Sequence, residues 1–266
     1  MANNLGVSSS SSYINSAQSS AARASERIAS GLRINRAGDD AAGLAISNRL
    51  VSSITEFSQS MRNAGDGISL AQTASGDLSS MTENLQRLRE LSIQAANGIL
   101  NDKDREAIGA EAKQLGAEIV RIAENSNFNG VPLLSGDSSV SIQVGDSGLE
   151  IQTANLQDEL VNLGLAELDL SSAAGAQSAL SVLDDLQARV ASVDTEFGAS
   201  VNRLESTINN LGISQENAEA SRSRIQDADI AREVSVLARS LILQEAGIAL
   251  QAQANNDRSL VLKLLG

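Results

Sequence analysis

Several residue types that enzymes and compact domains depend on are scarce or missing in this chain of 266 residues. It contains no Cys, no His and no Trp, one Pro, and four aromatic residues in total. Without Cys there can be no disulfide bond or thiolate nucleophile, and without His the commonest general base and metal ligand is missing. Few bulky side chains remain to fill a round core. We therefore expect a protein that is not an enzyme and that holds no cofactor and no metal.

The remaining catalytic candidates are carboxylates, and they are poorly arranged. Asp39-Asp40 and Asp184-Asp185 are adjacent pairs, and neighbouring positions point to different sides of a helix. We interpret both pairs as solvated or helix-starting carboxylates. Gly65 and Gly67 lie in a helical stretch, where close approach of another element is a better explanation than phosphate binding.

The net charge of -13 comes from the middle of the chain. Residues 61–226 carry eleven basic and twenty-four acidic side chains, whereas residues 1–60 carry five and four, and residues 227–266 carry four and five. No basic stripe is present to neutralise phosphates, so we expect no nucleic-acid partner. No stretch approaches the roughly 20 apolar residues of a membrane span, so we expect no membrane partner either. The first residues lack the basic and apolar regions of a cleaved signal peptide.

Two long segments repeat apolar residues at coiled-coil spacing. Between residues 50 and 78 the steps alternate mostly between four and three, and between residues 183 and 225 an apolar residue recurs at every seventh position. The two stripes are expected to face each other, and we call their main positions the rod seam. We predict a mainly α fold: a long coiled-coil rod with a small β-hairpin region, in which the N- and C-terminal helices pair. The rod seam consists of Leu50, Ile54, Phe57, Met61, Ile68, Leu183, Val190, Phe197, Leu204 and Leu211.

The pattern between these stripes predicts the local structure. A glycine-rich linker is expected at about 31–43, and the long helix after it should end where Asn97-Gly98 adopts the left-handed conformation. Asn101 or Asp102 can start the next helix, which should fold back as a helical hairpin. Alternating apolar residues then predict a β-hairpin at about 139–153. A loop region should follow, until the C-terminal long helix begins at about residue 173.

The last forty residues are apolar on nearly every face of the helix that they predict. Such a helix is buried all round, or unfolded until a partner covers it. The N-terminal segment offers only one weak stripe, which includes Ile14 and Ile28. We expect the missing partner to be another copy of the same chain.

Four long motifs in the same order resemble bacterial flagellin. They are Ser30–Ser47, Asn63–Ala74, Asn127–Gly130 and Ala246–Leu265. The resemblance implies an inner terminal coiled-coil domain made of residues 1–41 and 227–266, surrounded by a helical rod domain of residues 42–226. Outer variable domains are expected to be absent, because only about thirty residues separate the hairpin from Leu183. Assembly is expected to involve Ile14, Ile28, Leu32, Leu237, Leu241, Ile248 and Leu262.

The resemblance also implies a function and partners. The chain would self-assemble into the flagellar filament for swimming motility, and its terminal helices would order on polymerisation. It would reach the extracellular filament without a cleaved signal peptide, and meet other flagellin subunits, hook-associated and cap proteins, and an export chaperone. Flagellin-sensing Toll-like receptors would recognise Arg87, Leu91 and Glu111. The alternative interpretation of that motif makes Arg87 a solvated charge, while Leu91 packs on the helical hairpin.

Two alternatives to a flagellin remain at this point. Hook-filament junction proteins share the terminal helices, although the motif at Asn127–Gly130 favours flagellin. The heptads alone also allow a coiled-coil scaffold that never polymerises. Removing residues 227–266 would separate these possibilities, because only a filament subunit would lose polymerisation.

Overall fold

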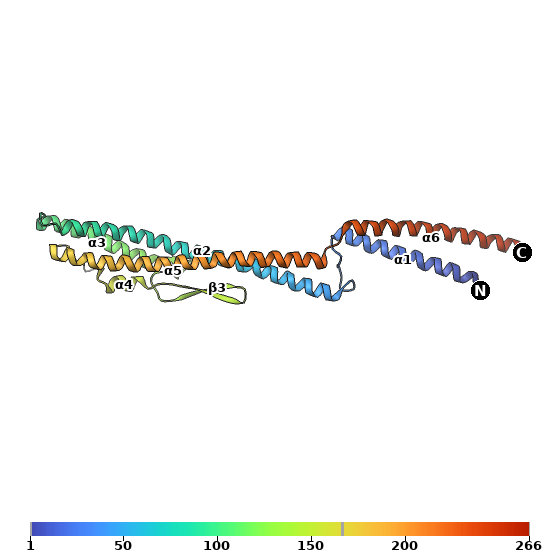
Figure 1. Cartoon of the computed structure of the whole chain (residues 1–266), viewed down its shortest axis with the longest axis horizontal. Helices are drawn as coiled ribbons and strands as arrows, with labels where there is room; N and C mark the ends of the chain where they lie inside the picture. The colour runs from blue at the N-terminus through green and yellow to red at the C-terminus, as the bar shows by residue number, and fades with distance from the viewer. Residues whose placement is uncertain (1, 166–167, 266) are drawn as a thin grey trace. The chain divides into compact units, whose positions relative to one another are not determined.

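The structure, a computed structural model, consists mainly of α-helices (Figure 1). It describes residues 2–165 and 168–265, and within them every side chain except those of 2–10, 257–258 and 260–265. The mainly α fold expected from the sequence is confirmed. In chain order the helices are α1 (Ala2–Ser30), α2 (Ala41–Ala95), α3 (Asp102–Asn125), α4 (Leu156–Asn162), α5 (Ala173–Gln226) and α6 (Ile230–Leu265). The strands are β1 (Asn127–Phe128), β2 (Val131–Pro132), β3 (Ser139–Val144) and β4 (Ser147–Gln152).

The chain divides into two compact units. Unit 1 comprises Met1–Ile54 and Glu216–Gly266, and unit 2 comprises Thr55–Gln215. In unit 1, α1 runs toward the linker at residues 31–40 while α6 runs away from residue 229, so the two helices pack as an antiparallel pair (Figure 1). The expected pairing of the N- and C-terminal helices is confirmed. Because some 200 residues separate these helices, only tertiary packing brings them together.

Unit 2 is built around α2, α3 and α5, with α4 and the β3–β4 hairpin beside them (Figure 1). Its core is one continuous cluster in which α2 contributes Leu78 and Leu85 and α5 contributes Phe197. The expected packing of α2 against α5 is therefore present. Within the rod seam, Leu183, Val190, Phe197 and Leu204 are buried, whereas Leu50, Ile54, Phe57, Met61, Ile68 and Leu211 are half-buried. The seam thus buries its α5 side more completely than its α2 side.

The end of α2 differs from the sequence-based prediction, which was wrong here. The helix ends at Ala95, and neither Asn97 nor Gly98 adopts a positive φ. The buried side chain of Arg105 performs the closure instead: its Nε donates to the carbonyl of Ala95 at 3.0 Å, and its Nη2 donates to the carbonyl of Asn97 at 3.0 Å. Unsatisfied carbonyls at a helix C-terminus favour a cationic donor, so no left-handed residue is needed.

The start of α3 is as predicted. The side chain of Asn101 accepts a hydrogen bond from the backbone amide of Asp104 at 3.0 Å, which caps the first turn. Asp102 and Asp104 add negative charge in that turn, where the helix dipole favours it. The chain then folds back along α2 and forms the expected helical hairpin.

The β-hairpin predicted at 139–153 is confirmed. β3 and β4 pair antiparallel with Val144 opposite Ser147, and Gly145 occupies the turn with φ 63°. The hairpin lies against α2, where a Cβ on Gly67 would approach Ile142 and Leu204 to 3.2 Å each. Gly67 therefore allows the close approach expected of it, whereas a Cβ on Gly65 would meet nothing within 4 Å. The loop expected after the hairpin contains the short helix α4, which the sequence pattern did not reveal.

Candidate functional site

The seam between α1 and α6 is made of small side chains. Ala17, Ala21 and Ala24 of α1 are buried, and Ser240 of α6 is buried opposite them. A Cβ on Gly247 would lie 2.7 Å from Cγ1 of Ile14, so this glycine lets the two helices approach closely. Because small side chains bury little apolar area, the contact between α1 and α6 contributes little hydrophobic stabilisation.

Several large apolar side chains of α6 remain exposed, and two of them, Leu243 and Leu250, border the groove beside this seam. Among the described residues, Leu241 is 51%, Ile242 66%, Leu243 55% and Leu250 66% exposed. Ile230, Val234, Leu241 and Ile248 share one side of α6 by their spacing and form an exposed row, and Tyr13 of α1 is 75% exposed. A groove of about 340 Å³ lies between the helices, lined by Ala17, Ser240, Leu243, Gly247 and Leu250 among others. Exposed apolar side chains in such number are typical of a protein–protein interface.

The residues expected to act in assembly fall into two groups. Leu241 and Ile248 are 51% and 54% exposed, so their side chains are open to a second molecule. Ile14, Ile28, Leu32 and Leu237 are half-buried within unit 1, which leaves less of their surface open to a second molecule. The side chain of Leu262 lies outside the described residues.

The two linkers of unit 1 are bonded to each other. The Arg33 amide donates to the carbonyl of Gln226 at 2.6 Å, and the Ala228 amide donates to the carbonyl of Gly31 at 2.9 Å. Gly31 has φ 72°, a conformation that glycine adopts without strain. These bonds frame an antiparallel bridge between Leu32 and Asp227. The ends of α1 and α5 are therefore held in a fixed register.

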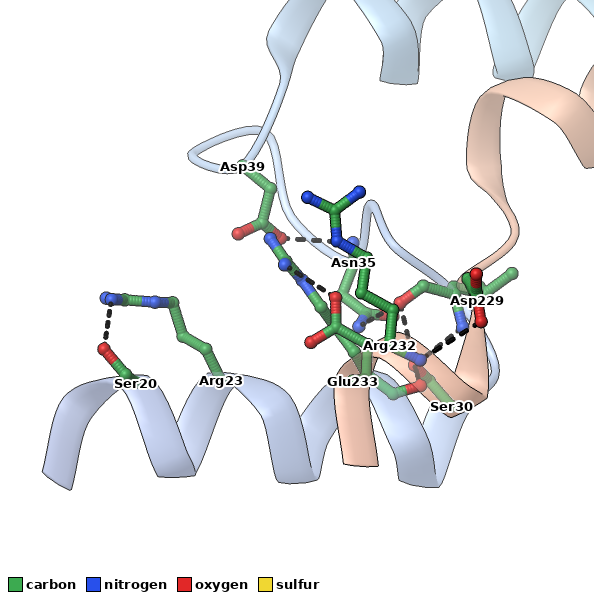
Figure 2. A network of polar contacts seen from close by, with 10 residues as sticks. Ser20, Arg23, Ser30, Asn35, Asp39, Asp229, Arg232 and Glu233 are labelled. Atoms are coloured by element: carbon green, nitrogen blue, oxygen red, sulfur yellow. Dashed lines mark hydrogen bonds and ion pairs between the residues drawn. The ribbon is translucent and has the colours of Figure 1, made fainter. Parts of the chain in front are cut away.

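Charged side chains reinforce the junction at the start of α6. Glu233 is buried, and its Oε1 lies 3.1 Å from Nη1 of Arg27 on α1. Figure 2 shows the side chains of Asn35, Asp39 and Glu233 gathered where the first linker faces α6. Asp229 caps α6 by accepting the amide of Arg232 at 3.1 Å, also visible in Figure 2.

Asp39 organises the first linker. Its Oδ2 accepts the backbone amides of Asn35 at 3.2 Å and Arg36 at 3.1 Å. These two hydrogen bonds, first that of Asn35, hold the pKa of Asp39 below its usual value, with smaller contributions from Arg27 and Arg36. Asp39 and Asp40 are thus turn and cap residues, since Asp40 accepts the amide of Gly43 at 2.8 Å.

A second candidate site lies on unit 2, where α2 and α3 run side by side. Arg87 of α2 and Glu111 of α3 form an exposed ion pair, with 2.9 Å between Nη2 and Oε1, and Arg87 also contacts Glu90 at 3.0 Å. The hydrogen bonds to Glu111 and then Glu90 raise the pKa of Arg87. Leu91, the third expected residue, is only 2% exposed and belongs to the hydrophobic core of unit 2. The structure therefore brings Arg87 and Glu111 together on the surface, whereas Leu91 lies in the core.

Sequence reasoning missed several residues of these sites. The sequence analysis did not single out Glu233 or Arg27, because no local pattern links residues so far apart. Gly247 could have been noticed, because a glycine within an apolar helix often marks a close approach. Among the described residues, no group of three or more acidic side chains could hold a metal ion. None of the described helices is long and apolar enough to cross a membrane.

Comparison with known proteins covers most of the chain. A family model for the bacterial flagellin N-terminal helical region matches residues 2–139, and one for the C-terminal helical region matches residues 180–265. A flagellin from Halalkalibacterium halodurans is 42% identical over 247 residues, which cover 91% of each chain. A flagellar filament 31.3 kDa core protein from Treponema maltophilum is 36% identical over 259 residues, which cover 90% of each chain.

Solved structures give the same fold. A crystal structure of Bacillus cereus flagellin has a TM-score of 0.51 at 30% identity, and covers 56% of this chain and 88% of that one. A putative flagellar hook-associated protein from Vibrio parahaemolyticus has a TM-score of 0.61 at 17% identity, and covers 71% of this chain and 100% of that one. The second likeness shows the fold alone. Because the two flagellin models match most of the chain and a relative shares 42% identity over 91% of it, the chain belongs to the bacterial flagellin family.

Proposed function

We infer that this chain is a structural subunit that assembles with other flagellin subunits into the bacterial flagellar filament for swimming motility. The observation that carries this conclusion is the match of both terminal regions to flagellin. The family is one of structural proteins, which agrees with the lack of His and Cys. A junction protein remains the alternative, but the putative flagellar hook-associated protein of the same fold has only 17% identity, whereas flagellin relatives reach 42%. A scaffold that never polymerises has no support from either comparison.

We propose that the exposed row on α6 is the principal assembly surface. Leu241, Ile248 and their neighbours are about half exposed in the isolated chain. Completing the burial of one such side chain contributes about 1 kcal/mol, roughly half the value for full burial. Several of them acting in each subunit would offset a substantial loss of translational freedom on assembly. The terminal helices would then be most stable in the filament, where folding and polymerisation are linked.

An electron-microscopy experiment tests this surface. Leu241→Asp should leave the monomer folded, because the side chain is already 51% exposed, yet it should prevent filament formation in seeded assembly. Val161→Asp is the matched control, since Val161 is 54% exposed on α4 of unit 2. Filaments from Leu241→Asp at the wild-type critical concentration would exclude α6 as the assembly surface. Failure of both variants would point to a general solubility effect.

We propose that the paired terminal helices form the inner layer of the filament and that the rest of the chain forms the outer layer. Residues 1–41 and 227–266 would form the inner coiled-coil domain, and residues 42–226 the outer rod, without additional variable domains. The acidic side chains of residues 61–226 would then face water. Trypsin digestion of assembled filaments should cleave exposed sites after Arg121 or Arg203 before sites after Arg23 or Arg239. Preferential early cleavage in the terminal helices would contradict this arrangement.

The proposed filament function also implies partners in export and at the two ends of the filament. The exposed row on α6 requires a cover before assembly, so an export chaperone should bind the C-terminal helix. Hook-associated and cap proteins would meet the first and last subunits of the extracellular filament. Secretion would leave the N-terminus uncleaved, which mass spectrometry of filament protein can test. A shortened N-terminus on the secreted chain would disprove secretion without a cleaved signal.

A second function is favoured by the arrangement of Arg87 and Glu111. We propose that a flagellin-sensing Toll-like receptor contacts this exposed pair on the monomer, while buried Leu91 holds the α2 surface in position. Arg87→Asp should reduce receptor signalling in reporter cells. Arg121→Asp is the matched control, because Arg121 forms an equally exposed pair with Glu118 within α3. Equal signalling by wild type and Arg87→Asp would remove the pair from the receptor site.

A further inference from the structure

The sequence contains two Asn-Gly dipeptides, which have the same reactive groups but lie in different surroundings. Asn97-Gly98 lies in the turn between α2 and α3, and Asn129-Gly130 joins β1 to β2. In such a pair the backbone nitrogen of the glycine can reach the side-chain amide carbon of the preceding asparagine, because glycine has no Cβ to obstruct the approach. Filament assembly as proposed above uses neither pair.

The side chain of Asn97 is folded over the next peptide. Its Oδ1 accepts a hydrogen bond from the backbone amide of Ile99 at 3.2 Å, which closes an Asx turn around the Gly98 peptide. Within the described part of the chain, no acceptor binds the Gly98 N–H. Both Asn97 and Gly98 are exposed, and a Cβ on Gly98 would meet nothing within 4 Å. Water therefore reaches the reacting atoms freely.

We propose that Asn97 is a site of spontaneous deamidation through a succinimide. The Gly98 nitrogen gives its proton to water acting as base and attacks Cγ of Asn97, so that an N–Cγ bond forms and negative charge develops on Oδ1. The Ile99 amide already donates to Oδ1 and stabilises that charge. Collapse breaks the Cγ–Nδ2 bond, and the protonated leaving group departs as ammonia. Water then adds to either imide carbonyl and yields aspartate or isoaspartate, with no change of oxidation state.

Asn129 lacks this arrangement. It has φ 52° and Gly130 has φ 81°, which makes the pair a two-residue hairpin turn between Phe128 and Val131. Within the described residues the Asn129 side chain has no hydrogen-bond donor comparable to the Ile99 amide. Rotation of the backbone toward attack would break the pairing of β1 with β2. The same dipeptide is therefore protected in this turn.

Deamidation of Asn97 should alter the hydrogen bonds that Arg105 makes at the C-terminal end of α2. The carbonyl of Asn97 accepts Nη2 of Arg105 at 3.0 Å and the Leu100 amide at 3.3 Å. Isoaspartate routes the main chain through the former side chain and adds one backbone atom, so that the former Asn97 carbonyl becomes a free carboxylate and is no longer part of the main chain that Arg105 closes. The product also carries one additional negative charge. A deamidated subunit should therefore have a looser turn between α2 and α3.

The test is peptide mass spectrometry of the full-length protein during incubation in mildly alkaline buffer. Conversion at Asn97 should be faster than at Asn129 by about fivefold or more, the effect of one hydrogen bond made to the transition state. In denaturant the two sites should react at similar rates. Methyl transfer by an isoaspartate methyltransferase identifies the rearranged product.

Two variants at Ile99 separate the effect of the hydrogen bond to Oδ1 from the effect of the Asn-Gly dipeptide itself. Ile99→Pro removes the N–H that donates to Oδ1 and should slow conversion, whereas Ile99→Ala keeps the N–H and should not. Gly98→Ala should slow the reaction in either background, and circular dichroism confirms that each variant is folded. Equal rates at Asn97 and Asn129 in the native protein, or an unchanged rate in Ile99→Pro, would overturn the proposal.

Discussion

Arg27 of α1 and Glu233 of α6 form an ion pair with 3.1 Å between Nη1 and Oε1, at side-chain exposures of 29% and 12%. Arg27→Ala would leave the buried Glu233 carboxylate without its cation, so we expect the α1–α6 pair to lose about 1 to 3 kcal/mol of stability. Hydrogen exchange of α1 and α6 amides measures this loss. Arg23→Ala is the control, because within the described residues the Arg23 guanidinium hydrogen-bonds only the Ser20 hydroxyl, at 3.4 Å. Equal loss in both variants would show that the pair itself contributes nothing.

A methyl group at position 247 should separate the terminal helices. Gly247→Ala places a Cβ 2.7 Å from Cγ1 of Ile14, and such overpacking typically costs about 1 to 3 kcal/mol. Assembly should then require a higher protein concentration, as measured by sedimentation of filaments. Gly212→Ala on α5 meets nothing within 4 Å and should be stabilising by about 0.5 to 1 kcal/mol through helix propensity. A normal critical concentration for Gly247→Ala would mean that α1 and α6 do not keep this contact in filaments.

Replacing Arg105 should open the end of α2. Its guanidinium bridges the carbonyls of Ala95 and Asn97, and a lysine ammonium lacks the fork that reaches both. We expect Arg105→Lys to lose about 1.5 to 3 kcal/mol, the contribution of charged hydrogen bonds, in thermal unfolding of the full chain. Arg121→Lys is matched, because Arg121 is an exposed residue of the same helix. Similar melting of the two variants would rule out the closure by Arg105.

The first linker should respond to acid through Asp39. Because its pKa is lowered in the folded protein by the amides of Asn35 and Arg36, its stabilising contribution is complete above the ordinary value of 3.8. The contribution disappears as the pH falls through the lowered pKa. Amide exchange at Asn35 and Arg36 should therefore increase only under strongly acidic conditions, and Asp39→Asn should abolish that step. A titration midpoint of the Asp39 carboxyl at or above 3.8 would contradict the bonding seen here.

Local and periodic features could be predicted from the sequence. The heptads of Leu183 to Leu211 predicted the seam of α5, alternation from Val140 to Ile151 predicted the β-hairpin, and Asn101 predicted the cap of α3. These features depend on neighbours a few residues apart, whose spacing decides which face of a helix or strand is apolar. The exposed apolar side chains of α6 could also be predicted, because the last forty residues have more apolar faces than the N-terminal helix could cover.

Only the tertiary structure decided which distant residues meet. Arg105 closes α2 in place of the Asn97-Gly98 pair, α4 forms within an expected loop, and Glu233 is buried against Arg27. None of these has a local signal, because a charged side chain or a short segment acquires its partner only when separate helices pack. The sequence by itself therefore determined the helices, the hairpin and the apolar surplus at the C-terminus. Packing decided the junction of the terminal helices and the exposure of Arg87, Glu111 and Asn97.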